Sequence, residues 1–182
     1  MPANAPAADP RRRPTGGAAL AALIVALAAF ALYRATLLPG FDFGDTGSFQ
    51  ATVGSPVITP RDGYPFYFAI GSAFMRLTGM EAAHALNLAS AIEAALACGL
   101  MVLAAAEISG STIAAVGAAM LFGVSYTFWS QAVIAEVYAL HAVFLALTLL
   151  LLLRWAERPT TGRLRGSACS GRAAVPPSLG AR

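Results

Sequence analysis

Four long apolar runs limit what this chain can fold into. They cover Gly16–Leu38, Leu86–Ala106, Ile113–Phe128 and Val137–Trp155. A transmembrane helix needs about 20 mostly apolar residues, and only the third run is short by that measure. Hydrophobic residues make up 58% of the 182 residues and charged residues 12%, against about 25% charged in soluble domains. The sequence therefore predicts an all-α fold, a polytopic helical membrane protein with about four transmembrane helices.

The first apolar run could instead belong to an export signal, because Arg11, Arg12 and Arg13 precede it. The run is long, however, and no clean small-residue cleavage site follows it. Further apolar runs also come after it. We therefore interpret the first run as a retained membrane anchor.

The arginines predict the orientation of the chain. All twelve basic residues are Arg; three precede the first run and six lie at the carboxyl end, whereas the loop Pro39–Ala85 has only two. Arginine-rich segments stay in the cytoplasm, and an even number of spans places both tails on one side. We expect a multi-pass protein of the cell (inner) membrane with cytoplasmic termini and with Pro39–Ala85 and Ser125–Glu136 external. Residues 1–15 and 159–182 are predicted to be disordered tails around a membrane region at 16–158.

Composition argues against some partners. The arginines flank apolar runs and do not form a patch with aromatic residues, so no nucleic-acid binding is expected. Cys98 lies in an apolar run and Cys169 in the polar tail, so a disulfide is not expected. No motif has the spacing of metal ligands, and no metal site is expected.

Two of the connecting segments also predict structure. Phe66–Leu77 has aromatic and aliphatic residues at helical spacing, which predicts a short interfacial helix. Only the residues Glu107–Ser111 separate the second and third runs. Those two spans should therefore form an antiparallel helical hairpin.

Asp45 is the main catalytic candidate, in the segment Phe41–Gly47 just outside the first span. Transfer of a glycosyl group to a hydroxyl needs a base that takes the acceptor proton. Asp42 could share the site, and Gly44 and Gly47 would let a substrate approach the backbone. The alternatives are that Asp45 is the N-cap of a helix starting near Gly47 and that Asp42 is a solvated loop acid.

Other polar residues could bind substrate. Arg61 offers a guanidinium suited to a phosphate, with a surface pair with Asp62 as the alternative. Glu136 could orient a polar headgroup or bind a partner in the first loop, and Tyr138 lies beside it. Their alternative is an acid favoured by the helix dipole within an interfacial aromatic belt. Glu93, inside the second run, could face a cavity or have a structural role.

Four segments, in the same order, resemble motifs of the protein O-mannosyltransferase-like family. Phe43–Phe49 is similar to the family's Asp-Ser-Gly-Glu segment, with Ser48 at the position of the Glu. Gly63–Tyr67 resembles Pro-Pro-Gly-Tyr-Pro-Leu-Tyr, and Asn87–Ala91 resembles Asn-Leu-x-Ser-Ala. The closest resemblance is Phe128–Leu140, which contains Trp-Ser-Gln-Ala-x-x-x-Glu-Val-Tyr.

The resemblance implies a GT-C glycosyltransferase. Such an enzyme transfers a hexosyl group such as mannose from a polyprenyl-phosphate donor to an acceptor hydroxyl on the external face. Asp45 would be the base or an acceptor-binding residue, and Glu136 would correspond to the family's acid of the second loop. The expected partners are the lipid bilayer, a polyprenyl-linked sugar and a protein or glycan acceptor, with no cofactor besides the donor.

GT-C enzymes have many more spans, so the chain is expected to be an amino-terminal fragment whose activity alone is an open question. A second interpretation is a non-catalytic membrane module or truncated remnant that binds lipid or a partner. A third is a small transporter, which Glu93 within an apolar run suggests.

Overall fold

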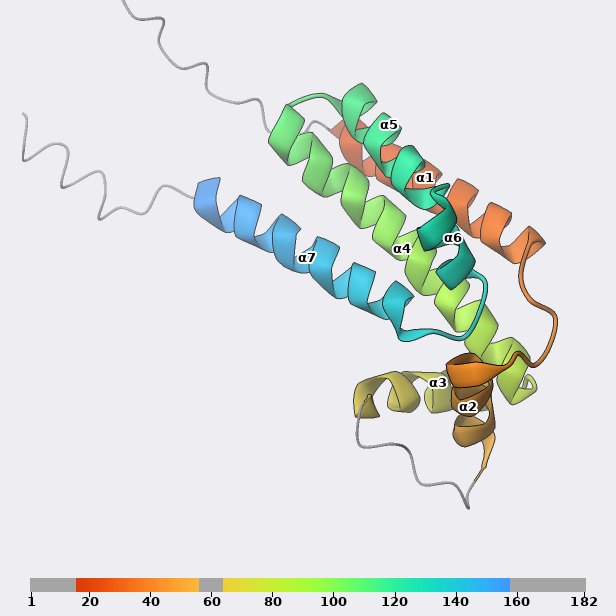
Figure 1. The fold of residues 1–182 in the computed structure, drawn as a ribbon. Coiled ribbons are helices and arrows are strands. Elements are labelled where there is room, and N and C mark those ends of the chain that lie inside the picture. The colour runs from red at the N-terminus through yellow and green to blue at the C-terminus, as the bar shows by residue number, and fades with distance from the viewer. Residues whose placement is uncertain (1–15, 56–63, 158–182) are drawn as a thin grey trace, which may run out of the picture.

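The structure is a bundle of α-helices. The computed structural model describes residues 16–55 and 64–157, which form seven α-helices and no strand (Figure 1). In chain order the helices are α1 (Gly16–Ala35), α2 (Gly44–Gly54), α3 (Pro65–Thr78), α4 (Ala82–Ser109), α5 (Thr112–Gly123), α6 (Tyr126–Ala132) and α7 (Val137–Glu157). The predicted all-α fold class is confirmed. The predicted disordered tails and Arg61 lie outside the described residues.

Three helices, α1, α4 and α7, are long and apolar enough to cross a membrane. They coincide with the first, second and fourth apolar runs, and α4 extends beyond its run at both ends. Helices α5 and α6 pass the same test together but are bent by 67°. The chain is therefore a multi-pass membrane protein with three spans, or four if the bent pair crosses as one.

The predicted span Ile113–Phe128 is not one straight helix. α5 ends at Gly123, and α6 starts at Tyr126. The hydroxyl of Tyr33 in α1 donates a hydrogen bond to the Gly123 carbonyl oxygen at 2.8 Å. A Cβ atom at Gly123 would lie 3.0 Å from Cys98 Sγ and 3.1 Å from the Tyr33 hydroxyl oxygen. At the bend, the backbone thus packs against side chains of α1 and α4, and the Gly123 carbonyl accepts a hydrogen bond from Tyr33.

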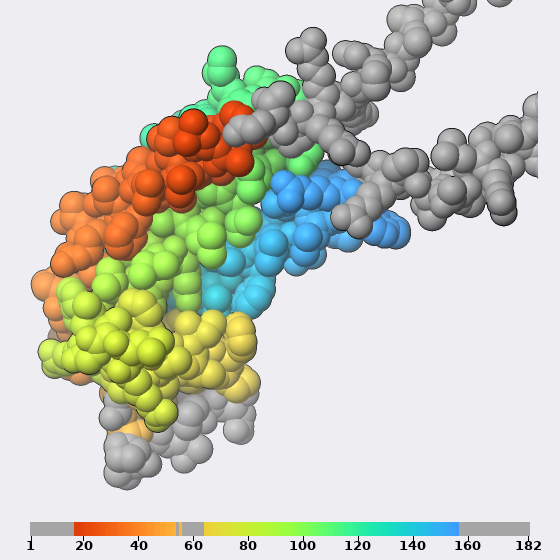
Figure 2. Space-filling view, turned by 180° about the vertical axis from the view of Figure 1, so that it is seen from behind, coloured from red at the N-terminus to blue at the C-terminus, as the bar shows by residue number. Residues whose placement is uncertain are grey.

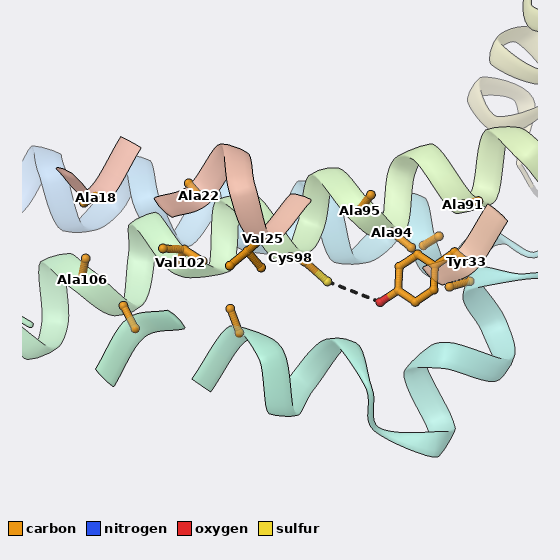
Figure 3. Packing of buried hydrophobic residues seen from close by; sticks show 14 residues of the cluster. Ala18, Ala22, Val25, Tyr33, Ala91, Ala94, Ala95, Cys98, Val102 and Ala106 are labelled. Carbon is orange, nitrogen blue, oxygen red and sulfur yellow. Dashed lines mark hydrogen bonds between the residues drawn. The ribbon is translucent and has the colours of Figure 1, made fainter. Parts of the chain in front are cut away.

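α4 is the centre of the bundle. Helices α1, α5 and α7 all pack against it, and Figure 2 shows α4 between α1 and α7. Small residues allow α1 and α4 to approach closely: a Cβ atom at Gly99 would lie 3.1 Å from the Ala22 carbonyl oxygen. Figure 3 shows Ala22 and Val25 of α1 beside Cys98 and Val102 of α4. Such small-residue contacts are typical of membrane helices.

α4 and α5 form the predicted antiparallel hairpin (Figure 1). Gly110 ends α4 with a φ of 65°, a left-handed conformation that favours glycine. The Ser111 hydroxyl caps α5 by accepting a hydrogen bond from the Ala114 backbone N–H at 3.4 Å. Near this turn, Arg154 Nε of α7 donates to Glu107 Oε1 at 3.1 Å. This ion pair joins the last turn of α7 to the end of α4.

α2 and α3 lie at the end of the bundle opposite the start of α1 and the end of α7 (Figure 1). α3 confirms the helix predicted at Phe66–Leu77 and starts with Pro65 in a position that proline favours. A helix in the place of α2 was predicted only as the alternative role of Asp45, with its start near Gly47, and α2 starts at Gly44. It packs on α3 through Phe49, whose ring centroid is 5.4 Å from that of Tyr67 and 5.7 Å from that of Phe68. The start of α1 and the end of α7 lie at the same end of the bundle (Figure 1).

Candidate functional site

Three polar residues of α4, namely Asn87, Ser90 and Glu93, repeat at every third position. This spacing places them along one side of the helix. The 28 residues of α4 make it about 42 Å long at roughly 1.5 Å per residue, whereas the hydrocarbon layer is about 30 Å thick. If the Glu107–Arg154 pair marks one membrane surface, the other surface falls near Asn87. On that placement the polar stripe starts at the boundary with Asn87 and runs into the membrane toward Glu93.

Asn87 holds the segment before α2 against α4. Its Nδ2 atom donates to the carbonyl oxygens of Leu38, at 2.9 Å, and Gly40, at 3.2 Å. Its Oδ1 atom accepts from Gln50 Nε2 at 2.9 Å, and Gln50 Oε1 accepts from the Asp42 backbone N–H at 3.1 Å. Both amide side chains are fully buried, where unpaired polar groups are costly. This network fixes the position at which α2 begins.

The two acidic motifs of the sequence meet at Glu136. Thr46 is buried in the first turn of α2, and its hydroxyl donates to Glu136 Oε1 at 2.8 Å. The backbone N–H of Glu136 donates to Ser90 Oγ at 3.4 Å. Glu136 thus has a partner in the first loop, one of the two roles proposed for it from the sequence. Helices α2 and α4 and the segment before α7 share this site.

Asp45 lies beside Thr46 in the first turn of α2, with its side chain exposed. The alternative that Asp45 caps a helix starting near Gly47 is wrong, because α2 begins at Gly44 and Phe43 occupies the N-cap position. An acid in the first turn still interacts favourably with the helix dipole. The carboxylate of Asp45 therefore lies at the surface of the site, next to the buried Thr46.

Gly44 and Gly47 are needed for the backbone conformation and packing of this segment. Gly44 has a φ of 69°, which favours glycine. A Cβ atom at Gly47 would overlap the carbonyl oxygen of Asp42. Asp42 itself is half-buried, and its Oδ1 atom accepts from the Phe43 backbone N–H at 2.8 Å. The close approach that Gly47 permits is therefore between α2 and the residues that precede it.

Tyr138 is placed apart from Asp45. It is exposed in the first turn of α7 and lines a cavity of about 400 Å³ together with residues of α5, α6 and the bend between them. Those residues are Phe122, Ser125, Thr127, Phe128 and Gln131. No residue of α2 lines this cavity, so the structure groups Glu136 with Thr46 and Ser90 and groups Tyr138 with α6.

Tyr67 of α3 adds a buried phenol to the site. Its side chain is 6% exposed, and its hydroxyl has no hydrogen-bond partner among the described residues. Burial raises the pKa of Tyr67, and the charges of Glu93 and Glu136 raise it further. The nearby Ser90 hydroxyl acts in the opposite direction, although it does not reach hydrogen-bond geometry with Tyr67.

Sequence patterns identify the acids of this site but not their partners. Thr46, Gln50 and Tyr67 each meet residues far away in the chain, and nothing in their own neighbourhood indicates the pairing. The signal that was available is the three-residue spacing of polar residues in α4, because a membrane helix tolerates such a stripe only against polar partners.

Comparison with known families adds a separate finding. Residues 45–169, more than half of the chain, match a family model described as the protein O-mannosyl-transferase TMEM260 N-terminal domain. The chain belongs to this family. The match runs from the first turn of α2 through α7, so it includes both Asp45 and Glu136. The resemblance to protein O-mannosyltransferases is thereby confirmed at the level of the family. No solved structure matches the chain.

Proposed function

We propose that this chain is the amino-terminal part of a GT-C membrane glycosyltransferase. It transfers a sugar from a polyprenyl-phosphate donor to an acceptor hydroxyl on the external face of the cell membrane. The observation that carries the proposal is the 2.8 Å hydrogen bond between Thr46 and Glu136. It joins the two acidic motifs at the membrane boundary in a member of an O-mannosyl-transferase family.

Asp45 acts as the base in this proposal. The acceptor hydroxyl attacks the anomeric carbon of the sugar while its proton passes to the Asp45 carboxylate. The bond between that carbon and the phosphate oxygen breaks, and the polyprenyl phosphate leaves with the electron pair, which inverts the anomeric configuration. The exposure of Asp45 in the first turn of α2 supports this role, because an acceptor can reach it.

Four other residues bind substrate in this proposal. Glu136 is held by Thr46 and Ser90 and binds polar groups of the sugar or acceptor. Asp42 lies just before α2, and Tyr138 faces the cavity beside α6. Arg61 is proposed from the sequence as a phosphate ligand, because its guanidinium forms paired hydrogen bonds with phosphate oxygens. Both termini are cytoplasmic in this arrangement, as the arginine distribution predicts.

The test uses the full chain in proteoliposomes with radiolabelled polyprenyl-phosphate mannose and a Ser/Thr-containing acceptor peptide. Asp45→Asn should lower transfer by about 10²–10⁴-fold, the usual contribution of a general base. Asp9→Asn, the same change in the amino tail, is the control and should transfer normally. Unchanged transfer by Asp45→Asn would contradict the assignment of the base. A wild-type chain that binds donor without transferring sugar would favour the non-catalytic module.

A further inference from the structure

Two buried polar atoms of the described residues have no hydrogen-bond partner: the Tyr67 hydroxyl and Glu93 Oε2. An unpaired buried polar group costs about 1–3 kcal/mol, so native proteins contain few of them. Tyr67 on α3 belongs to the buried cluster that contains Ala135 and Val137, the residues on either side of Glu136. The Glu136 backbone N–H donates to Ser90 Oγ, and Ser90 lies one helical turn before Glu93 on α4, so Tyr67 and Glu93 flank the same segment. Both orphan atoms are therefore parts of the same site.

Three further groups surround this pair. Glu136 also acts on the Tyr67 hydroxyl, and Ser90 lies beside it. Each of these two already has a partner: Glu136 accepts from Thr46, and Ser90 Oγ accepts from the Glu136 backbone N–H. The polar network is thus complete on the side of α2 and incomplete on the side of α3. The incomplete side offers one donor, the phenol, and one acceptor, the carboxylate.

A single hydroxyl group matches this pair. An alcohol can donate its proton to Glu93 Oε2 while its oxygen accepts from the Tyr67 hydroxyl. A carbonyl or phosphate oxygen would satisfy only the phenol, and an ammonium group would satisfy only the carboxylate. We propose that Tyr67 and Glu93 bind one hydroxyl of the substrate, from either the transferred sugar or the Ser/Thr acceptor. The inference rests on the proposed function and adds two substrate-binding residues to it.

A cavity reaches the Tyr67 side of this pair. A space of about 180 Å³ lies between α3 and the first turns of α7, and Tyr67 lines it together with Phe66, Val137, His141 and Phe144. Val137 directly follows Glu136, so the cavity adjoins the network.

The experiment measures binding before turnover. The full chain in nanodiscs is heated alone, with polyprenyl-phosphate mannose, with polyprenyl phosphate, with a Ser/Thr acceptor peptide, and with the same peptide carrying Ala at those positions. A ligand that binds the folded chain raises its Tm. Tyr67→Phe removes only the hydroxyl, and Glu93→Met removes the carboxylate at similar length. The matched controls are Tyr126→Phe and Glu81→Met, because both of those side chains are exposed.

The inference predicts a specific combination of results. Without ligand, neither Tyr67→Phe nor Glu93→Met should lower Tm, because neither orphan atom has a partner to lose. With ligand, both variants should weaken binding by about 5- to 50-fold, the loss of one hydrogen bond. If the variants lose the difference in Tm between polyprenyl-phosphate mannose and polyprenyl phosphate, the donor sugar is the source of the hydroxyl. If the variants lose the difference in Tm between the Ser/Thr peptide and the Ala peptide, the acceptor is the source of the hydroxyl.

Three results would overturn the inference. A lower Tm of both variants without ligand would mean that the two groups stabilise the fold itself. Unchanged affinity for both ligands would mean that the pair holds water or nothing. A wild-type chain that neither ligand stabilises would leave no substrate hydroxyl for the pair to bind. Failure of the proposed catalysis looks different, because it is a chain that binds both ligands through Tyr67 and Glu93 but transfers no sugar.

Discussion

Replacing Thr46 by Val tests the contact that joins the two halves of the site. Valine has nearly the shape of threonine, and Thr46 is only 3% exposed, so the change removes the hydroxyl with little repacking. The lost hydrogen bond is short, at 2.8 Å, and its acceptor is a carboxylate. Hydrogen bonds to charged groups contribute about 1.5–3 kcal/mol. In a chain of this size we expect Tm to fall by about 3–12 °C.

A double-mutant cycle isolates the contact itself. Thr46→Val, Glu136→Ala and the double variant are compared by thermal unfolding in detergent, and their coupling energy should be about 1.5–3 kcal/mol. Thr46→Ser, which keeps the hydroxyl, should recover most of the loss. Thr78→Val is the matched control: its hydroxyl donates to the Phe74 carbonyl of its own helix in an exposed position, so its loss should cost much less.

A coupling energy below about 0.5 kcal/mol would refute this reasoning, because it would mean that Thr46 and Glu136 stabilise the fold independently. Sugar transfer gives a second reading of the same variants. If Thr46 positions Glu136 for substrate, Thr46→Val should raise KM more than it lowers kcat, and Thr46→Ser should restore KM.

Four other changes test separate parts of the structure. Asn87→Leu removes three hydrogen bonds and should lower the free energy of unfolding by about 3 kcal/mol in denaturant titrations. Gly123→Ala should lower Tm because its Cβ has no room, whereas Gly117→Ala in the same helix, with nothing within 4 Å, should leave Tm unchanged or higher. Because burial raises the pKa of Tyr67, the phenol ionises at lower pH in the unfolded chain than in the folded chain, so the free energy of unfolding falls as pH rises above about 10. Tyr67→Phe should therefore flatten the alkaline fall of Tm. Asp45→Cys, with the tail cysteine replaced, should react with an impermeant maleimide from outside the cell; labelling only from inside would contradict the external site.

The membrane helices could be predicted from the sequence because length and hydropathy alone define them. The ends of α1 and α7 fall within three residues of the predicted runs. The helix α3 was predicted from the spacing of its aromatic residues. α2 was predicted only as an alternative and with a later start, because glycine, threonine and serine make up over half of its sequence, GDTGSFQATVG, and these are weak helix formers. Tertiary contacts of Phe49 with α3 stabilise it instead.

The site was predictable only in part for the same reason. An acid beside an apolar run is visible in the sequence, so Asp45 and Glu136 were found. The hydrogen bond from Thr46 to Glu136 joins residues 90 positions apart, and no local pattern encodes such a pairing. The bend after α5 was also invisible, because the hydrogen bond from Tyr33 of α1 to the Gly123 carbonyl at the bend joins residues 90 positions apart.

That bend has a consequence for the site. After it, α6 returns to the end of α1: Trp129 Nε1 donates to Thr36 Oγ1 at 3.0 Å, and the Leu38 backbone N–H donates to the Val133 carbonyl at 3.1 Å. The chain then needs only three residues to bring Glu136 over Ser90 and beside Thr46. A straight helix through Gly123 would lose this return path.

The bend between α5 and α6 therefore links the packing of Gly123 to the position of Glu136. Gly123→Ala should therefore disturb the bend and shift Glu136. We expect it to reduce sugar transfer as well as Tm, even though it touches no residue of the site. Gly117→Ala, on the same helix, should change neither, and a Gly123→Ala chain with full transfer activity would show that the bend and the site are independent.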